Sequence, residues 1–474
     1  MIPDDSHLKL AVLDAVQRAQ AMPGTVDIPS LLEGVRTGAN ELLLREDDGF
    51  FLRFIAEGAA LVKEVGGTAP ALSGSRDADL AAVLDAGAQA AATFAARATA
   101  EADAMVARLV GWEKQLHTYR NQRAKIAGGE GPLSGITAER FEAYLRDHRS
   151  EWADPKVMSF RMVPGGFSKI TVLAEVQDGD GEPEGLALRI EPARRMLDLD
   201  GMLVSGEYPL VCHAFQSGLP VAEPLFLEND PAFLGLKFMV SRRAPGRVLG
   251  TYTGAAEPVS QDKLKDAIAL IVQMQKVPVE SSSPLIQQSY MSRWLGYSTL
   301  AEGTRAVVEY WRDMGHACRA PASAILERAT AWMLAHVPAE DGRAVLNHGD
   351  FGFHNILFDG DRISALLDWE NSRLGDPAEE LALFVMASSA HATREQIMAW
   401  YDAAGGEPIS EYRLRYYDVY HTYKVIISAL VALQRVQDDP RGSLNLAVFG
   451  LQYMAPMADK LEEQIAAAEA CQPD

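Results

Sequence analysis

The chain has 474 residues, 48% of them hydrophobic, which is enough for two or three domains with apolar cores. No apolar run approaches the ~20 residues of a membrane-spanning helix, and a formal net charge of −21 makes nucleic acids and anionic membranes poor partners. Three widely spaced cysteines, Cys212, Cys318 and Cys471, argue against a disulfide framework or a zinc site. The first ten residues lack the basic and apolar segments of a signal peptide. We therefore predict a cytoplasmic protein.

Residues 1–130 are predicted to be helical. Periodic apolar positions indicate helices over 7–22, 28–44 and 50–65. Residues 76–126 lack proline and are rich in alanine, which favours helix. We expect two packed helices there, joined near residues 96–101. This part carries no catalytic set, so we expect a bundle for packing or self-association, and a homodimer through these helices stays open.

The segment Gly128-Gly129-Glu130-Gly131-Pro132 is the strongest linker signal in the chain. All motifs with chemistry lie beyond it, and a fragment beginning near Leu133 is expected to fold alone. Next come a helix capped by Thr137 and two strands on either side of Gly165-Gly166, a glycine pair that lets backbone amides approach a phosphate. Further strands are predicted at Leu186–Ile190 and 236–240.

Residues 345–370 carry the clearest catalytic pattern. Two apolar runs flank Asp359-Gly360, a strong hairpin signal. Asp350 precedes this hairpin, Asn355 follows Asp350 by five positions, and Asp368 ends the second strand. The order and spacing match the H-R-D-x-x-x-x-N and D-F-G elements of protein kinases. We predict that Asp350 orients the acceptor hydroxyl and takes its proton, and that Asn355 and Asp368 bind Mg²⁺.

The stretches HGDFGFHNILF and LLDWENSRLGDPAEELA resemble the aminoglycoside phosphotransferase-like, kinase-like superfamily. The second is similar to the branch of phosphotransferase domains related to those attached to acyl-CoA dehydrogenases. The resemblance begins near Ile136 and implies an α+β, bilobal protein-kinase-like fold with an additional N-terminal all-helical domain. The implied domains are a helical bundle at 1–130, an N-lobe at 131–241 and a C-lobe at 242–474 that contains the catalytic hairpin 345–370.

The resemblance also implies ATP as the phosphoryl donor and Mg²⁺ as its metal ion. Arg189 stands at the position of the kinase strand lysine, where it would hold nucleotide phosphates, and Glu207 is the helix glutamate expected to pair with it. The other implied nucleotide-binding residues cover the phosphates or lie at the hinge beside adenine: Gly165, Gly166, Ser168, Met239 and Ser241. Lys169 replaces a usual asparagine and His354 a usual glycine, and the sequence assigns neither a role.

The acceptor is predicted to be a small-molecule alcohol, with a hydroxy acid, its CoA ester or another hydrophobic alcohol preferred from the branch resemblance. The acidic chain also suits a cationic antibiotic such as an aminoglycoside, and a macrolide is a further antibiotic acceptor. An alternative of another class is a nucleotide-binding scaffold with weak catalysis, in which the helical domain does the work. The tyrosines at 417, 420 and 423 share one helical face and are assigned either to the core or to an acceptor pocket.

Overall fold

The computed structural model describes most of the chain from Asp48 onward: residues 48–74, 76–95, 99–121, 136–163, 169–191, 203–251, 254–255, 258–318, 323–339, 342–438 and 444–473. Backbone contacts divide the chain into two compact units. We call Leu133–Thr304 with Ala339–Tyr417 the mixed unit. We call Met1–Pro132, Arg305–Pro338 and Asp418–Asp474 the helical unit. Each unit is described separately below.

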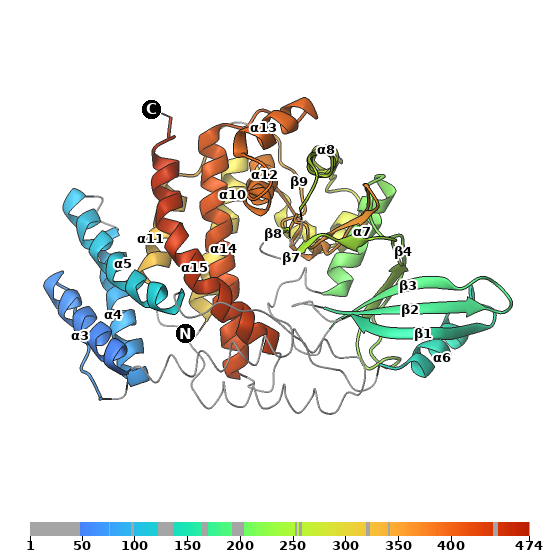
Figure 1. Cartoon of the computed structure of the whole chain (residues 1–474), viewed down its shortest axis with the longest axis horizontal. Coiled ribbons are helices and arrows are strands. Elements are labelled where there is room, and N and C mark those ends of the chain that lie inside the picture. The colour runs from blue at the N-terminus through green and yellow to red at the C-terminus, as the bar shows by residue number, and fades with distance from the viewer. Residues whose placement is uncertain are drawn as a thin grey trace. The chain divides into compact units, whose positions relative to one another are not determined.

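A five-stranded antiparallel sheet opens the mixed unit, with strand order β1-β2-β3-β5-β4 (Figure 1). The strands are β1 (Pro155–Val163), β2 (Ile170–Asp178), β3 (Glu184–Ile190), β4 (Pro224–Glu228) and β5 (Phe238–Arg242). Helix α6 (Ala138–His148), capped by the Thr137 hydroxyl, buries Phe141 and Leu145 against the sheet.

Side chains on β2 and β3 alternate between the two faces of this sheet, as strand geometry requires. The residues that pack with α6 are fully buried and occupy every second position: Val172, Ala174, Val176, Leu186, Leu188 and Ile190. Arg189 falls between two of them and therefore points to the opposite face. Lys169, one position before β2, has the same parity as the β2 residues on that opposite face.

The segment 345–375 forms short strands in the mixed unit. β9 (Val345–Asn347) pairs with β12 (Arg373–Gly375), and β10 (Ile356–Asp359) pairs with β11 (Arg362–Leu366) across the turn at Gly360. Two further short strands, β7 (Gly250–Thr251) and β8 (Gly254–Ala255), pair with each other, and β6 (Arg247–Val248) adds to β10. Besides α6, the helical elements that lie wholly within this unit are α7 (Val204–Gln216), α8 (Gln261–Gln275), α9 (Pro284–Gln288), η2 (Tyr290–Trp294), η3 (Trp369–Asn371), α12 (Pro377–Ser388) and α13 (Arg394–Ala403).

The helical unit joins segments that are distant in sequence. Helix α4 packs on α3, α5 and α11, and α5 also contacts α15. The Trp112 indole of α5 stacks on Phe54 with ring centroids 4.5 Å apart, and its Nε1 donates to the Phe54 carbonyl at 3.0 Å. Gly58 is required beside it, because a Cβ there would lie 2.0 Å from the indole. The elements are α3 (Asp48–Glu64), α4 (Arg76–Ala95), α5 (Ala100–Asn121), most of α10 (Leu300–Ala317), α11 (Ala324–Ala335), most of α14 (Glu411–Asp438) and α15 (Leu444–Glu469).

These observations confirm the α+β class and the helical N-terminal region, including two helices within residues 76–121. The expected helices at 7–22 and 28–44 and the linker at 128–132 lie outside the described residues. The division into domains at residues 130 and 241 stays a prediction, because the compact units group the chain differently without testing what folds alone. Among the described helices, none combines the length and apolar character that crossing a membrane requires.

Candidate active site

The loop that carries Asp350 is held from two sides. Gly349 adopts φ +76°, and a Cβ there would lie 2.3 Å from the Asn371 carbonyl oxygen, so this position requires glycine. The Glu380 carboxylate accepts the backbone N–H groups of His348 and of Gly349, the latter at 3.0 Å. Glu380 therefore positions the loop that carries Asp350.

The His348 ring is buried and neutral. Its Nε2 donates to the Leu367 carbonyl at 2.8 Å, and its Nδ1 finds no hydrogen-bond partner among the described residues. Protonation would place an N–H on that unpartnered atom, and burial lowers the pKa of His348 to about 4. His348 thus ties the loop to the backbone next to Asp368.

Asp350 and Asn355 form one hydrogen-bonded unit. Asn355 Nδ2 donates to the Asp350 carbonyl at 2.9 Å and to Asp350 Oδ2 at 3.0 Å. His354 Nε2 lies 3.2 Å from the same Oδ2. Burial lowers the pKa of His354, but the charge and hydrogen bond of Asp350 outweigh burial, and the net shift is upward. His354 therefore contacts the carboxylate of Asp350, the residue expected to be catalytic. The sequence assigned no role to His354, and its spacing of four residues from Asp350 was the available signal.

Asp368 occupies a strained backbone position. Its φ and ψ are both 66°, the left-handed region, and no other described non-glycine residue has a positive φ. The Arg189 guanidinium lies 2.5 Å from Asp368 Oδ1, and the next backbone N–H, of Trp369, donates to Glu207 Oε1 at 2.9 Å. Non-glycine residues in this conformation persist where neighbours over-determine them, and such positions cluster at functional sites.

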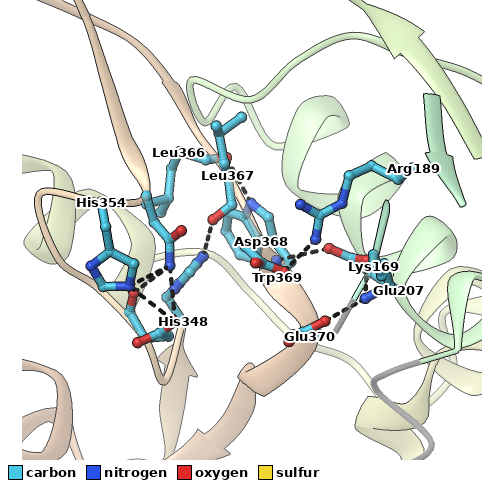
Figure 2. A network of polar contacts seen from close by, with 12 residues as sticks. Lys169, Arg189, Glu207, His348, His354, Leu366, Leu367, Asp368, Trp369 and Glu370 are labelled. Carbon is cyan, nitrogen blue, oxygen red and sulfur yellow. Dashed lines mark hydrogen bonds and ion pairs between the residues drawn. The ribbon is translucent and has the colours of Figure 1, made fainter. Parts of the chain in front are cut away.

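Lys169 completes a cluster of ion pairs beside Asp368 (Figure 2). Its Nζ lies 2.8 Å from Glu207 Oε2 and 2.5 Å from Glu370 Oε2, and its side chain has no exposed surface. Burial opposes the charge of Lys169, but the two carboxylates outweigh it and raise the pKa of the ammonium. Burial, followed by the charge of Asp368, raises the pKa of Glu370 to about 7, and Lys169 opposes that rise. We call Lys169, Arg189, Glu207, Asp368 and Glu370 the ion-pair cluster.

The pairing within this cluster differs from the expectation. Glu207 was expected to pair with Arg189, but its ion pair is with Lys169, and Arg189 pairs with Asp368. The reason is positional: Lys169 and Arg189 share one face of the sheet, and Lys169 is the cation within contact distance of α7. In the sequence, the signal for a role of Lys169 was that lysine replaces the asparagine usual at this position.

The other residues expected at the site lie on β5, outside the described residues or in the cores. Met239 lies on β5 directly opposite Arg189 in the strand register, and Ser241 lies opposite Ala187, both half-buried. Gly165, Gly166 and Ser168 fall outside the described residues. Tyr417, Tyr420 and Tyr423 are buried, with hydroxyl contacts from Tyr417 to Thr304 and from Tyr423 to Thr330, and so belong to the cores.

The residues present fit a hard divalent cation. Asn355 commits its amide nitrogen to Asp350, which leaves the amide oxygen as its ligand atom. Asp368 is about one-quarter exposed and provides carboxylate oxygens. Amide and carboxylate oxygens are the ligands that Mg²⁺ prefers. Arg189 carries a permanent charge and a planar donor fork suited to phosphate, and Asp368 and Glu207 raise its pKa above the ordinary value against the effect of burial.

Comparison with known proteins identifies the family. A profile described as "Phosphotransferase enzyme family" matches residues 175–447, more than half of the chain. The chain is 25% identical over 257 residues to acyl-CoA dehydrogenase family member 11 of Pongo abelii, covering 53% of this chain and 31% of that protein. It is 26% identical over 225 residues to hygromycin-B 4-O-kinase of Escherichia coli, covering 43% and 59%.

The chain spans about a third of the length of the dehydrogenase relatives it matches. Among solved structures, a protein of Ralstonia eutropha named as a candidate aminoglycoside phosphotransferase superposes with a TM-score of 0.53 and 19% identity. That alignment covers 71% of this chain and 100% of the other. At this identity the likeness shows the fold alone, and it agrees with the kinase-like architecture expected from the motifs.

Proposed function

The chain belongs to the phosphotransferase enzyme family, and from this premise we propose that it transfers the γ-phosphoryl group of ATP, with Mg²⁺, to the hydroxyl of a small molecule. One observation carries the proposal: Asp350 and Asn355 are hydrogen-bonded to each other on the loop tied through His348 to the backbone beside Asp368. Phosphoryl transfer needs this combination of an orienting carboxylate and oxygen ligands for a metal ion.

Asp350 would act on the acceptor through one of its two oxygens. The contacts from Asn355 and His354 both reach Oδ2, so we assign Oδ1 to the acceptor hydroxyl. As the hydroxyl oxygen bonds to the γ-phosphorus and the bond to the ADP oxygen breaks, the hydroxyl proton passes to Asp350 Oδ1. Asn355 keeps the carboxylate in place throughout.

Asn355 and Asp368 would hold Mg²⁺, which when bound neutralises charge on the phosphates. Arg189 would hold the α- and β-phosphates, and its pair with Asp368 would be exchanged for these new partners. Met239 and Ser241 on β5 would contact the adenine side of the nucleotide, and Gly165, Gly166 and Ser168 would cover the phosphates. These assignments are supported by the match to kinase motifs and by the register of β3 and β5.

For the acceptor, we propose a hydroxy acid, its CoA ester or another hydrophobic alcohol, supported by similarity to the acyl-CoA dehydrogenase family relatives. A second candidate is an antibiotic, supported by the alignment with hygromycin-B 4-O-kinase and by a net charge of −21 that attracts a cationic sugar. The two differ in the charge of the acceptor, so a single panel separates them.

The test incubates the full chain with Mg²⁺ and ATP labelled at the γ-phosphate, against hydroxy acids, their CoA esters, hydrophobic alcohols and hygromycin B. We expect label in one acceptor class with wild type and with Asp359→Asn, a matched control at an exposed aspartate on the same hairpin. Asp350→Asn should transfer ~10²–10⁴-fold more slowly. Nucleotide binding without transfer to any acceptor would contradict the enzyme assignment and favour the scaffold.

A further inference from the structure

The Lys169 ammonium lies against a group of three carboxylates whose spacing could hold a metal ion. Glu207, Asp368 and Glu370 each contribute one carboxylate oxygen to this group, and these oxygens all lie within 4.8 Å of one another. Three carboxylates at this spacing repel one another unless a cation lies among them. In this chain the Lys169 ammonium lies there, within ion-pair distance of two of the three.

The charged side chains of Lys169, Glu207 and Glu370 are buried, so their charges are balanced by one another more than by water. The side chains of Lys169 and Glu207 are 0% and 1% exposed, and that of Glu370 is 7% exposed. Water therefore contributes little to screening, and removing one partner of such a pair leaves a buried charge uncompensated. Arg189 is engaged with Asp368, and Lys169 is the cation in ion-pair contact with both Glu207 and Glu370.

The same contacts tie Lys169 to the segment that carries Asp368. Glu370 follows Asp368 by two residues, and Glu207 accepts the backbone N–H of Trp369 between them. Lys169 binds both carboxylates at once, and it is itself the residue before β2. One side chain therefore connects the sheet, helix α7 and the Asp368–Glu370 segment.

We infer that the Lys169 ammonium occupies the site among Glu207, Asp368 and Glu370 that a divalent metal ion would otherwise fill. Through these contacts Lys169 positions Asp368. Its replacement by a neutral side chain should open a divalent-cation site among the three carboxylates. The cation part of this inference needs no catalysis, whereas the positioning part rests on the proposed function.

The first experiment measures Mn²⁺ binding to the full chain without nucleotide, by electron paramagnetic resonance of free Mn²⁺ and by thermal melting. Lys169→Met should melt below wild type and bind one additional Mn²⁺ per chain, with a melting temperature that rises as Mn²⁺ is added. The charge-balanced double variant Lys169→Met/Glu370→Gln should lose that additional ion. Lys263→Met is the matched control, because Lys263 pairs with the exposed Asp361 outside the cluster.

Lys169→Asn provides a second variant should Lys169→Met fail to fold, because its amide can donate to one carboxylate and reduce the cost of burial. An additional Mn²⁺ in either folded single variant supports the inference. Mn²⁺ stoichiometry equal to wild type in the folded single variants, or an equal gain in Lys263→Met, overturns it.

The second experiment measures kinetics with an acceptor that wild type phosphorylates. Substitutions behind a metal ligand typically reduce metal affinity or activity on the order of 10- to 100-fold. We expect that loss for Lys169→Met, with a raised Mg²⁺ half-saturation concentration and little change in acceptor KM. An unchanged Mg²⁺ dependence overturns the positioning role. Inactive wild type with the expected Mn²⁺ gain would refute the proposed function alone, so the two failures are distinguishable.

Discussion

The mixed and helical units are stabilised in different ways. In the mixed unit the described interior contains buried ion pairs, among them Lys169 with Glu207 and Glu370 beside Asp368, and Arg373 with Glu379. The described core of α3, α4 and α5 consists of aromatic and aliphatic side chains around Trp112. Buried charges that lose a partner are costly, whereas an apolar core responds to lost volume. Mutations at the buried charges of the mixed unit should therefore affect chemistry as well as stability, whereas mutations in the core of α3, α4 and α5 should affect stability alone.

The largest effect is expected from Asp350→Ala. Loss of a general base typically costs ~10²–10⁴-fold in rate, and Asp350 is not among the residues proposed to hold the ATP phosphates. Steady-state kinetics should show a fall of kcat in that range, with nucleotide affinity by calorimetry close to wild type. Asp359→Ala serves as the control. A variant with near-parental kcat would remove Asp350 from the reaction.

Asp368→Asn should come next, with activity that Mg²⁺ no longer restores at ordinary concentrations. A neutral amide is a weaker ligand for a hard cation than a carboxylate, and the variant also loses the ion pair with Arg189. Titration of Mg²⁺ against initial rate checks this. The same half-saturation concentration in variant and wild type would exclude Asp368 from the metal site.

Trp112→Ala tests the apolar side of the comparison. Replacing a buried tryptophan by alanine typically costs ~3–5 kcal/mol, and Trp112 also donates a buried hydrogen bond to Phe54. We expect a clearly lower free energy of unfolding by urea titration, with KM for ATP unchanged at a temperature where the variant is folded. A change in KM without a loss of stability would break the distinction between the units.

The comparison also shows what the sequence could predict. Asp350, Asn355 and Asp368 lie within one short stretch, so their spacing alone indicated their proximity. The Asp359-Gly360 dipeptide, which favours a tight turn, predicted the hairpin. Lys169 and Glu370 are 201 residues apart, and their contact depends on how the sheet and the hairpin come together. Helices α4 and α5 were predictable from composition, but their packing on α11 and α15 was not. An amphipathic pattern indicates which face of a helix is buried, but not which other helix covers that face. That a fragment beginning near Leu133 folds alone therefore stays a prediction.

His348 should give the stability curve a pH dependence. Its folded pKa of about 4 lies below the ordinary value of about 6.5 for an unfolded chain. As pH falls from about 6.5 to 4, the unfolded chain binds a proton on this histidine and the folded chain does not, so up to about 3 kcal/mol of stability is lost.

The measurement is urea unfolding between pH 4 and 7 for wild type and His348→Gln. The difference curve isolates His348 from other titrating groups, and the variant should lose less stability toward low pH. His316→Gln, at a side chain that is 57% exposed, is the control and should follow wild type. Parallel curves for His348→Gln and wild type would contradict the buried, neutral state.

The smallest effect concerns Glu113, a buried charge within the helical unit. Its carboxylate accepts from the Ser323 hydroxyl at 2.6 Å and from the Ile325 backbone N–H at 3.2 Å, so a residue of α5 caps the first turn of α11. A carboxylate at a helix N-terminus satisfies otherwise unpaired N–H groups and complements the helix dipole. Loss of a cap typically costs ~1–2 kcal/mol. We expect Glu113→Ala to lower the free energy of unfolding by about that amount and to leave kcat and Mg²⁺ dependence unchanged, with the isosteric Glu113→Gln losing less because its amide oxygen still accepts. Chemical unfolding with parallel kinetics tests both, and equal stability of all three proteins would show that α11 does not depend on this cap.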